Sequence, residues 1–173
     1  PYVVHVGGFS ERKNVGRVFA AAEVLAGDGV EVRLVGRPNA RCEEWLEGLS
    51  SEVRAKVRFT GFVDNAQLTR LYSEAACLMY PSLYEASGLP PSEAMRLGCP
   101  VVVSDLPVLR ERCGEAALYC DPLDVASLVA RVRDVLGDPV LARRLSQRGQ
   151  ARSQIFSWEN QARIIVRALV PAS

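Results

Sequence analysis

The chain has 173 residues, of which 49% are hydrophobic and 24% are charged, and its formal net charge is +1. These proportions are ordinary for a globular protein and exclude a disordered chain, while the near-neutral charge gives no electrostatic reason to expect nucleic acid as a partner. The apolar runs are far shorter than the ~20 residues that a membrane-spanning helix needs.

Short apolar, β-rich runs alternate with amphipathic segments over most of the chain. The runs predict six strands, at residues 2–6, 30–35, 57–60, 76–80, 100–104 and 116–120. Helical spacing of apolar residues predicts helices after Asn14, at 41–49, after Asp64 and from Glu93 to Gly98, with Asn14 and Asp64 as N-caps. Three further helices are expected between about residues 124 and 170.

Strands that are apolar on both faces and separated by helices favour a parallel sheet covered on both sides. The predicted fold class is therefore α/β, a Rossmann-like doubly wound parallel sheet, in one domain over residues 1–173. Ligands of such sheets bind beyond the carboxyl ends of the strands. The loops to consider are 7–13, 36–40, 61–65, 81–92 and 105–109.

The segment 81–95 is the most informative of these, because it holds two carboxylates, Glu85 and Glu93, with a glycine and two prolines between them. The pattern predicts a polar turn that leads into a helix starting at Glu93. Free N–H groups at a helix start attract phosphates, and carboxylates accept hydrogen bonds from hydroxyl groups. A phosphate next to a polyol suggests a nucleotide sugar as the ligand.

The loop 7–14 adds positive charge at the same sheet edge. Gly7 and Gly8 allow a tight turn and close approach of a ligand. Arg12 and Lys13 precede a helix start, where the helix dipole disfavours cations unless an anion such as a diphosphate compensates. A solvated basic pair is the equally weighted alternative, and the G-x-G-x-x-G dinucleotide pattern is absent.

Other interpretations stay open for the remaining polar groups. Taken singly, each glutamate is more easily explained by a structural role. A pair of carboxylates also fits glycoside hydrolysis, but the neighbouring cations and the parallel sheet make that reaction less natural here. The turns at 35–38 and 59–63 are either plain strand ends or the flanks of a nucleoside base. Structural roles are expected for Asp105, Glu111 and Trp158.

The cysteines and the single histidine argue against several chemistries. The five cysteines are scattered without a C-x-x-C pair, which favours buried free thiols in a reducing cytoplasm. His5 is the only histidine and lies in a predicted strand, so a histidine-based hydrolase or zinc site has little support.

Several motifs together resemble the C-terminal, donor-binding half of a GT-B glycosyltransferase, specifically glycosyltransferase family 4. The matching stretches are residues 6–14, 34–36, 57–63, 80–85, 93–95, 98–102, 114–117, 121–122 and 156–158. Their order and spacing match from about residue 2 to residue 169, and the Glu-x7-Glu element of Glu85 and Glu93 is fairly specific in this context.

The resemblance implies a site for a nucleoside diphosphate sugar, with Arg12 and Lys13 on the diphosphate, Glu85 on the donor sugar and Glu93 on the ribose. Catalysis would be positioning plus stabilisation of the departing diphosphate by Arg12, Lys13 and the helix end, with retention of anomeric configuration and no metal or other cofactor. The full set of expected substrate-binding residues is Gly7, Gly8, Gly36, Phe62, Val63, Ser82, Ser87, Gly88, Leu89 and Glu93.

The chain departs from the usual family pattern at four places: Gly8 replaces a frequent arginine, Ala86-Ser87 replaces Gly-Phe, Ser92 replaces an apolar residue, and a second glycine after Gly36 is missing. Arg12 is expected to substitute for the missing arginine. The other changes leave the donor sugar and the base-side loop undetermined.

The resemblance further predicts that an N-terminal acceptor domain precedes residue 1 in a longer enzyme, and that the isolated domain transfers sugar poorly. The expected location is the cytoplasm, with any attachment to the inner face of the membrane made by the missing half. The acceptor would be a saccharide or a lipid-linked saccharide in polysaccharide biosynthesis, and the donor GDP-mannose.

Three alternatives remain on the sequence alone. A nucleotide-sugar epimerase of GT-B architecture would need further acid-base groups, and His5 is poorly placed for that. A glycogen-type phosphorylase would need a lysine for a pyridoxal cofactor, and neither Lys13 nor Lys56 has a matching context. In a non-catalytic nucleotide-binding module, Glu85 and Glu93 would be merely structural.

Overall fold

The computed structural model describes residues 1–169, with only the backbone of Trp158, and contains a sheet of six parallel strands. The strand order is β3-β2-β1-β4-β5-β6. The strands are β1 Tyr2–Val6, β2 Glu31–Val35, β3 Val57–Phe59, β4 Cys77–Tyr80, β5 Val101–Ser104 and β6 Ala117–Cys120. All six predicted strands are confirmed to within one residue at each end.

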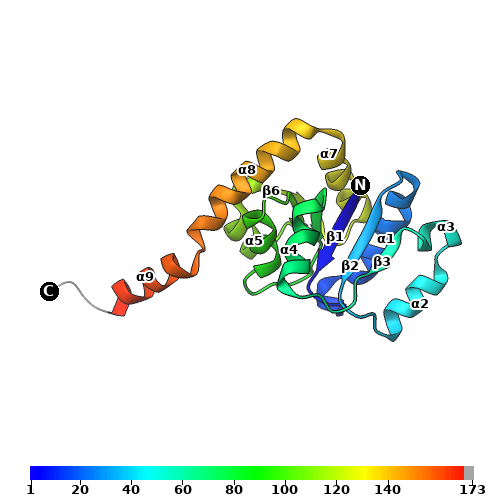
Figure 1. Cartoon of the computed structure of the whole chain (residues 1–173), viewed down its shortest axis with the longest axis horizontal. Coiled ribbons are helices and arrows are strands. Elements are labelled where there is room, and N and C mark those ends of the chain that lie inside the picture. Colours follow the sequence, from blue (N-terminus) through cyan, green and yellow to red (C-terminus); the bar gives the residue numbers. More distant parts are fainter. Residues whose placement is uncertain (170–173) are drawn as a thin grey trace.

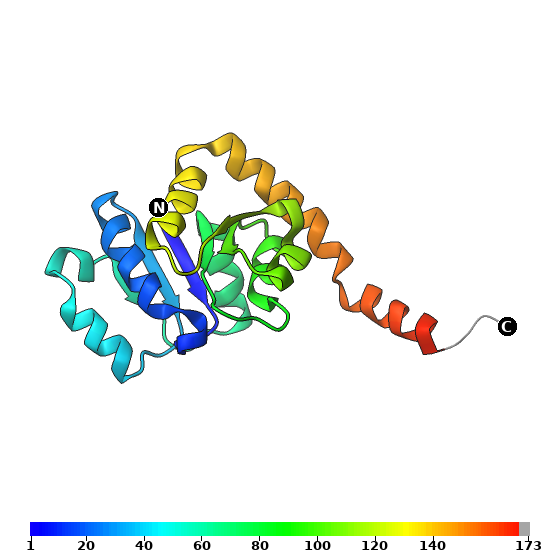
Figure 2. The same cartoon turned by 180° about the vertical axis from the view of Figure 1, so that it is seen from behind.

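Helices cover both faces of the sheet, as the apolar character of both faces predicts. The helices are α1 Val15–Gly27, α2 Ala40–Gly48, α3 Ser51–Arg54, α4 Asn65–Glu74, α5 Leu89–Arg96, α6 Pro107–Cys113, α7 Val125–Gly137, α8 Pro139–Ile155 and α9 Trp158–Leu169. Helices α4 and α5 cover one face (Figure 1), and α1 and α7 cover the other (Figure 2). The Rossmann-like doubly wound architecture is thereby confirmed.

Successive residues of a strand pack into two separate hydrophobic cores, one on each face of the sheet, because their side chains point to alternate faces. In β1, Val3 packs in the core beneath α1 and α7, while Val4 packs in the core beneath α4, α5 and α6. In β4, Met79 joins the first core and Tyr80 the second. Both faces of the two central strands are therefore fixed by apolar packing, which sets where their carboxyl ends lie.

One predicted boundary is wrong and matters for the site. Helix α5 begins at Leu89 and not at Glu93, with Gly88 as its N-cap in the left-handed conformation at φ 64°. Proline tolerates the first turn of a helix because its missing N–H has no intrahelical partner there, and Pro90 and Pro91 fill that turn. Glu93 consequently lies on the second turn, so helix capping does not explain it.

The C-terminal part of the described chain is helical, as predicted. The last residue of the predicted helical region, residue 170, lies outside the described residues. The side chain of Trp158 is also not described. Helix α8 runs alongside α5, and α9 extends away from the sheet (Figure 1). None of the helices in residues 1–169 combines the length and the apolar character that crossing a bilayer requires. The five cysteines are buried free thiols, as predicted.

Candidate functional site

The centre of the sheet is where the strand order reverses direction. Strands β1 and β4 are neighbours, but the chain continues from β1 toward β2 and from β4 toward β5. In open α/β sheets, ligands bind outside the carboxyl ends of the strands at such a reversal, and we call this edge of the sheet the crevice. The loops 7–13 and 81–88, which carry Lys13 and Glu85, lie at this edge.

A buried ion pair joins these two loops. The Lys13 Nζ donates to Glu85 Oε1 at 2.6 Å, and both side chains are almost fully buried. The Tyr80 hydroxyl, at the end of β4, donates to the same Glu85 oxygen at 2.8 Å and also contacts Lys13 Nζ. The interpretation of Lys13 as part of a solvated basic pair is therefore wrong.

These contacts keep Glu85 ionised. Burial alone would raise the pKa of its carboxyl, but the hydrogen bonds from Lys13 and Tyr80 outweigh it and hold the pKa below its usual range. The contacts converge on Oε1, which leaves Oε2 as an oriented acceptor for a further donor group. Such a carboxylate can accept a hydrogen bond from a hydroxyl group of a ligand.

Arg12 is the more accessible cation of the pair. Its side chain is 47% exposed, and its Nη1 lies 3.3 Å from Glu85 Oε1 and 3.2 Å from the carbonyl of Tyr84, to which it donates. The backbone N–H of Leu83 donates to the Arg12 carbonyl at 2.9 Å, so the two loops are also joined through the main chain. Arg12 is therefore placed to meet an anion that enters the crevice.

Asn14 has a different role from the predicted helix cap. It occupies the N-cap position of α1 with φ 57°, but its side chain caps nothing. The Nδ2 instead donates to the carbonyls of Pro81, at 2.9 Å, and Pro122, at 2.7 Å. Asn14 thus connects the loops that follow β1, β4 and β6, and it fixes the walls of the crevice.

Two glycines are required by their backbone conformation and surroundings. Gly7 has φ 130°, and a Cβ there would lie 3.1 Å from the Lys13 side chain. Gly88 has φ 64°, and a Cβ there would lie 2.8 Å from Leu109. Any other residue at Gly7 would therefore displace the Lys13 side chain. Gly8 is exposed beside it.

The start of α5, directly after the loop 81–88, has few free N–H donors. Among the first residues of the helix, Pro90 and Pro91 have no N–H. The backbone N–H groups without a partner inside the helix are therefore those of Gly88 and Leu89. Leu89 is exposed at this helix start. An anion there would interact with those N–H groups and with the helix dipole.

Glu93 lines a hollow of about 200 Å³ between α4 and α5. The hydroxyl of the buried Tyr72 donates to Glu93 Oε2 at 3.2 Å and orients it. Asn65, Leu68 and Thr69 of α4 form the other side of the hollow. An exposed, oriented carboxylate over a small hollow can accept hydrogen bonds from paired hydroxyl groups.

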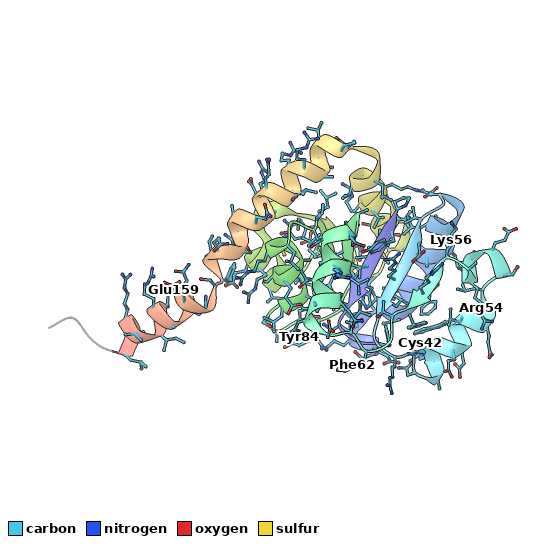
Figure 3. The ribbon with its side chains drawn as sticks, viewed as in Figure 1. Cys42, Arg54, Lys56, Phe62, Tyr84 and Glu159 are labelled. Atoms are coloured by element: carbon cyan, nitrogen blue, oxygen red, sulfur yellow. The ribbon has the colours of Figure 1, made fainter. Side chains whose placement is uncertain are left out.

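The loops after β2 and β3 form the far end of the same sheet edge. Gly36 donates from its N–H to the Gly61 carbonyl at 3.1 Å, which ties the two loops together. Phe62 is 89% exposed, Val63 is half-buried, and the side chains of Phe62 and Tyr84 project at the edge where the strands end (Figure 3). An exposed aromatic ring there offers a stacking surface.

The two predicted serine contacts differ in their surroundings. The Ser82 side chain is fully buried, its Oγ has no hydrogen-bond partner among the described residues, and its carbonyl accepts from Ser104 Oγ at 2.6 Å. Ser82 therefore lies beneath the loop and not on its surface. Ser87 is half-buried, and its carbonyl accepts from Arg112 Nε at 2.7 Å.

The prediction from sequence missed Tyr72, Tyr80 and the linking role of Asn14. Both tyrosines lie in segments whose apolar periodicity gives a sufficient reason for an aromatic residue. The available signal was weak: a tyrosine in place of a phenylalanine needs a partner for its hydroxyl when it is buried. No group of three or more metal-ligating side chains occurs within residues 1–169.

His5 gives a pH-dependent prediction. The ring is fully buried, Nδ1 lies 3.0 Å from the Met79 carbonyl, and Nε2 has no partner among the described residues. Burial lowers the pKa of this imidazole. Below about pH 6.5 only the unfolded chain then takes up the proton. The free energy of unfolding therefore decreases as the pH is lowered, by up to about 1.4 kcal/mol per pH unit. Urea unfolding at several pH values between 5 and 8 measures the slope.

Because His5 is the only histidine, the His5→Asn variant should lose this slope between pH 5.5 and 7. The slope is the readout, since the substitution also changes the overall stability. An equal slope in the variant would show that other groups cause the pH dependence.

The chain matches known proteins over nearly its whole length. A sequence profile of the family described as "Glycosyl transferases group 1" matches residues 1–152. O-antigen chain mannosyltransferase B of Escherichia coli is 33% identical over 92% of this chain and 43% of its own length. Glycogen synthase of Mycobacterium tuberculosis is 32% identical over 92% of this chain and 40% of its own length. The chain thus spans less than half the length of these relatives.

Solved structures agree on the architecture. Sucrose-phosphate synthase of Thermosynechococcus elongatus superposes with a TM-score of 0.83 at 33% identity, over 98% of this chain and 45% of its own. HepE of Anabaena, in complex with UDP and glucose, gives a TM-score of 0.80 at 21% identity, over 98% of this chain and 48% of its own, and this likeness concerns the fold alone. From the family match, the two curated relatives and the shared fold, the chain belongs to the group 1 glycosyltransferases.

Proposed function

We propose that this chain is the donor-binding half of a retaining glycosyltransferase of family 4 and GT-B architecture, and that it binds a nucleoside diphosphate sugar. The acceptor-binding half would precede it in a longer enzyme. The observation that carries the proposal is the ionised, buried Glu85, held by Lys13 at the strand-order reversal beside the start of α5. A polyol and a diphosphate would find complementary groups there.

The diphosphate would lie between Arg12 and the N–H groups of Gly88 and Leu89. Charge develops on the departing diphosphate as the bond to the sugar breaks, and donors already in place stabilise it without reorganisation. The buried Lys13 adds positive charge beside the site and fixes the orientation of the Glu85 carboxylate. With these cations and the helix start, no metal ion or other cofactor is assigned to the reaction.

Glu85 would accept a hydrogen bond from a hydroxyl of the donor sugar through its remaining oxygen, Oε2. This contact fixes the sugar relative to the diphosphate, and such positioning lowers the entropic part of the barrier. Glu93, oriented by Tyr72, would accept from the ribose hydroxyls, and the loops at Gly36, Phe62 and Val63 would flank the base.

The names of the relatives support a proposal for the donor sugar and the acceptor. Two of them are named O-antigen chain mannosyltransferases, from Escherichia coli and Salmonella typhimurium, at 33% and 32% identity. GDP-mannose is therefore the first donor to test, with a saccharide or lipid-linked saccharide as acceptor, in the cytoplasm. The rest of the enzyme supplies the acceptor site, so the 173-residue chain alone should bind donor without efficient transfer.

Two conservative substitutions test the assignment of the glutamates. Glu93→Gln should weaken binding of the free nucleoside diphosphate, because the charge-assisted hydrogen bonds to the ribose are worth about 1.5–3 kcal/mol, or about tenfold or more in Kd. Glu85→Gln should leave the free nucleoside diphosphate bound and weaken only the nucleotide sugar. Isothermal titration calorimetry with both ligands measures the four values.

Glu47→Gln is the matched control, since this carboxylate lies on α2, away from the crevice. Equal affinities for both ligands in the two variants would contradict the site assignment and favour a module in which Glu85 and Glu93 are structural.

A further inference from the structure

Tyr80 carries a hydroxyl group that reaches Glu85, although its ring belongs to the hydrophobic core. It is the last residue of β4, its side chain is fully buried, and its ring packs in the core beneath α4, α5 and α6. A ring in a close-packed core is held in one rotamer. The hydroxyl is therefore a hydrogen-bond donor at a fixed place relative to the sheet.

The contacts of this hydroxyl fix the direction of its proton. Lys13 Nζ donates to the Tyr80 oxygen, and the hydroxyl itself donates to Glu85 Oε1 at 2.8 Å. Because a hydroxyl group has a single proton to donate, its contact with the ammonium group directs that proton to the carboxylate. A further titratable group beside Tyr80 is His5, and the centres of the two rings lie 6.4 Å apart.

Three groups surround this one oxygen of Glu85, and they differ in charge and exposure. Lys13 Nζ lies at 2.6 Å and Arg12 Nη1 at 3.3 Å, and both are cations from the loop after β1. The Tyr80 hydroxyl is the neutral donor among the three, and it comes from β4, on the other side of the reversal in strand order.

A bound diphosphate would compete with Glu85 for the two cations, since guanidinium and ammonium groups pair with phosphates as they do with carboxylates. Arg12 is half-exposed, so its guanidinium can turn to a phosphate at the crevice. Lys13 would then divide its charge between the phosphate and Glu85. The Tyr80 hydroxyl carries no charge and is held by its buried ring, so it stays with the carboxylate.

We infer that Tyr80 is a positioning residue, which keeps Glu85 directed at the donor sugar once the diphosphate has drawn on the two cations. The inference rests on the proposed function and adds to it the residue through which Glu85 is held in the donor-bound state. Tyr80 thereby sets how well the chain distinguishes a nucleoside diphosphate sugar from the free nucleoside diphosphate. Tyr72, in contrast, acts through Glu93 on the ribose, which both ligands contain.

A tyrosine hydroxyl with a merely structural role would contribute to stability alone. Its loss would lower the stability of the fold without changing the relative affinity of two ligands. Tyr119 supplies that comparison, because its hydroxyl donates to the Gly114 carbonyl at 2.5 Å and it lies on β6, the strand at the far edge of the sheet. Tyr119→Phe is therefore the matched control.

The test is calorimetric titration of the unchanged chain and of Tyr80→Phe, Tyr72→Phe and Tyr119→Phe with two pairs of ligands, GDP with GDP-mannose and UDP with UDP-glucose. The readout is the Kd of the free nucleoside diphosphate divided by the Kd of its sugar conjugate. Tyr80→Phe should lower this ratio by about threefold to tenfold, the effect of one hydrogen bond, and change the affinity for the free nucleoside diphosphate by less than about twofold. Tyr72→Phe should weaken both ligands by the same factor, and Tyr119→Phe should leave the ratio unchanged.

The pKa of Glu85 is a second readout, and it needs no ligand. Burial raises the pKa of this carboxyl, and the hydrogen bonds from Lys13 and Tyr80 together lower it by more. Tyr80→Phe should accordingly raise the pKa of Glu85, and Tyr119→Phe should not. Titration of the glutamate carboxyl carbons by NMR measures it, with the signal of Glu85 identified by its absence in Glu85→Gln.

The outcomes separate this inference from the donor function. If the unchanged chain binds none of the four ligands, the donor function and the inference fail together. If it binds them and Tyr80→Phe keeps the ratio of the unchanged chain, the inference alone fails. An unchanged pKa of Glu85 in Tyr80→Phe, or an equal fall of the ratio in Tyr119→Phe, would also overturn it.

Discussion

Lys13→Ala should destabilise the protein by about 3 kcal/mol, because it removes the buried partner of Glu85 and leaves only the half-exposed Arg12, at 3.3 Å, to pair with it. The side chains of Lys13 and Glu85 are 5% and 6% exposed, so water cannot replace the lost charge. Chemical denaturation at pH 7 measures the change. This is the largest stability effect that we expect from a single polar substitution in the chain.

A double-mutant cycle separates the lost pair from other effects of the substitution. Glu85→Gln removes the carboxylate charge that Lys13→Ala would leave unpaired. The loss of unfolding free energy in the double variant should therefore be clearly smaller than the sum of the two single losses. Additive effects would show that the ion pair contributes nothing. Lys56→Ala, at a half-buried lysine in the turn before β3, is the matched lysine control and should change stability by less than about 0.5 kcal/mol.

The pair should also appear in the acid response. The lowered pKa of Glu85 means that its contribution to stability is present above the unfolded-state value of about 4.3. That contribution is lost as the pH falls through the lower folded-state pKa. Acid unfolding of Glu85→Gln should accordingly be less steep than that of the unchanged chain.

Arg12→Ala should weaken nucleoside diphosphate binding by about tenfold to a hundredfold, while the fold stays intact. Arg12 is half-exposed, and the buried Glu85 beside it keeps Lys13 as a partner, so removal of Arg12 leaves no buried charge unpaired. Any diphosphate bound between Arg12 and the start of α5 would lose a charge-assisted hydrogen bond. Calorimetric titration with GDP and UDP measures the loss, and the thermal midpoint without ligand checks the fold.

Arg41→Ala is the matched control, because Arg41 is an exposed arginine that pairs with Glu11 just outside the crevice. It should bind nucleotide like the unchanged chain. Equal losses in Arg12→Ala and Arg41→Ala would mean that general surface charge, and not a defined phosphate contact, attracts the nucleotide.

The sheet could be predicted from sequence because its signals are local. Val3 and Val4, or Met79 and Tyr80, are apolar neighbours that face opposite cores, and such uninterrupted apolar runs are characteristic of doubly covered parallel strands. The sequence order of the elements then makes the carboxyl edge the place to look for ligands. The candidate loops do follow strands β1 to β5 at this edge of the sheet, and their role in binding stays a prediction.

The hydrogen bonds and ion pairs within the site could not be predicted, because they join residues that are far apart in the sequence. Asn14 looks like a helix cap in sequence, but its side chain bonds to residues 67 and 108 positions away. The start of α5 was misplaced because a left-handed Gly88 followed by prolines resembles a turn as much as a helix start. The buried state of Lys13 likewise follows only from the packing of β1 against β4.

The most direct test of the account is a thermal-shift panel of the 173-residue chain with UDP, GDP, ADP and dTDP, each alone and as its common sugar conjugates. A ligand at about 100 times its Kd adds roughly 2.7 kcal/mol, which corresponds to about 5–10 °C for a chain of this length. We predict stabilisation by one nucleoside diphosphate, with GDP first, and a further increase with one sugar, both reduced in Arg12→Ala. No shift with any nucleotide at millimolar concentration would contradict the assignment of a donor site.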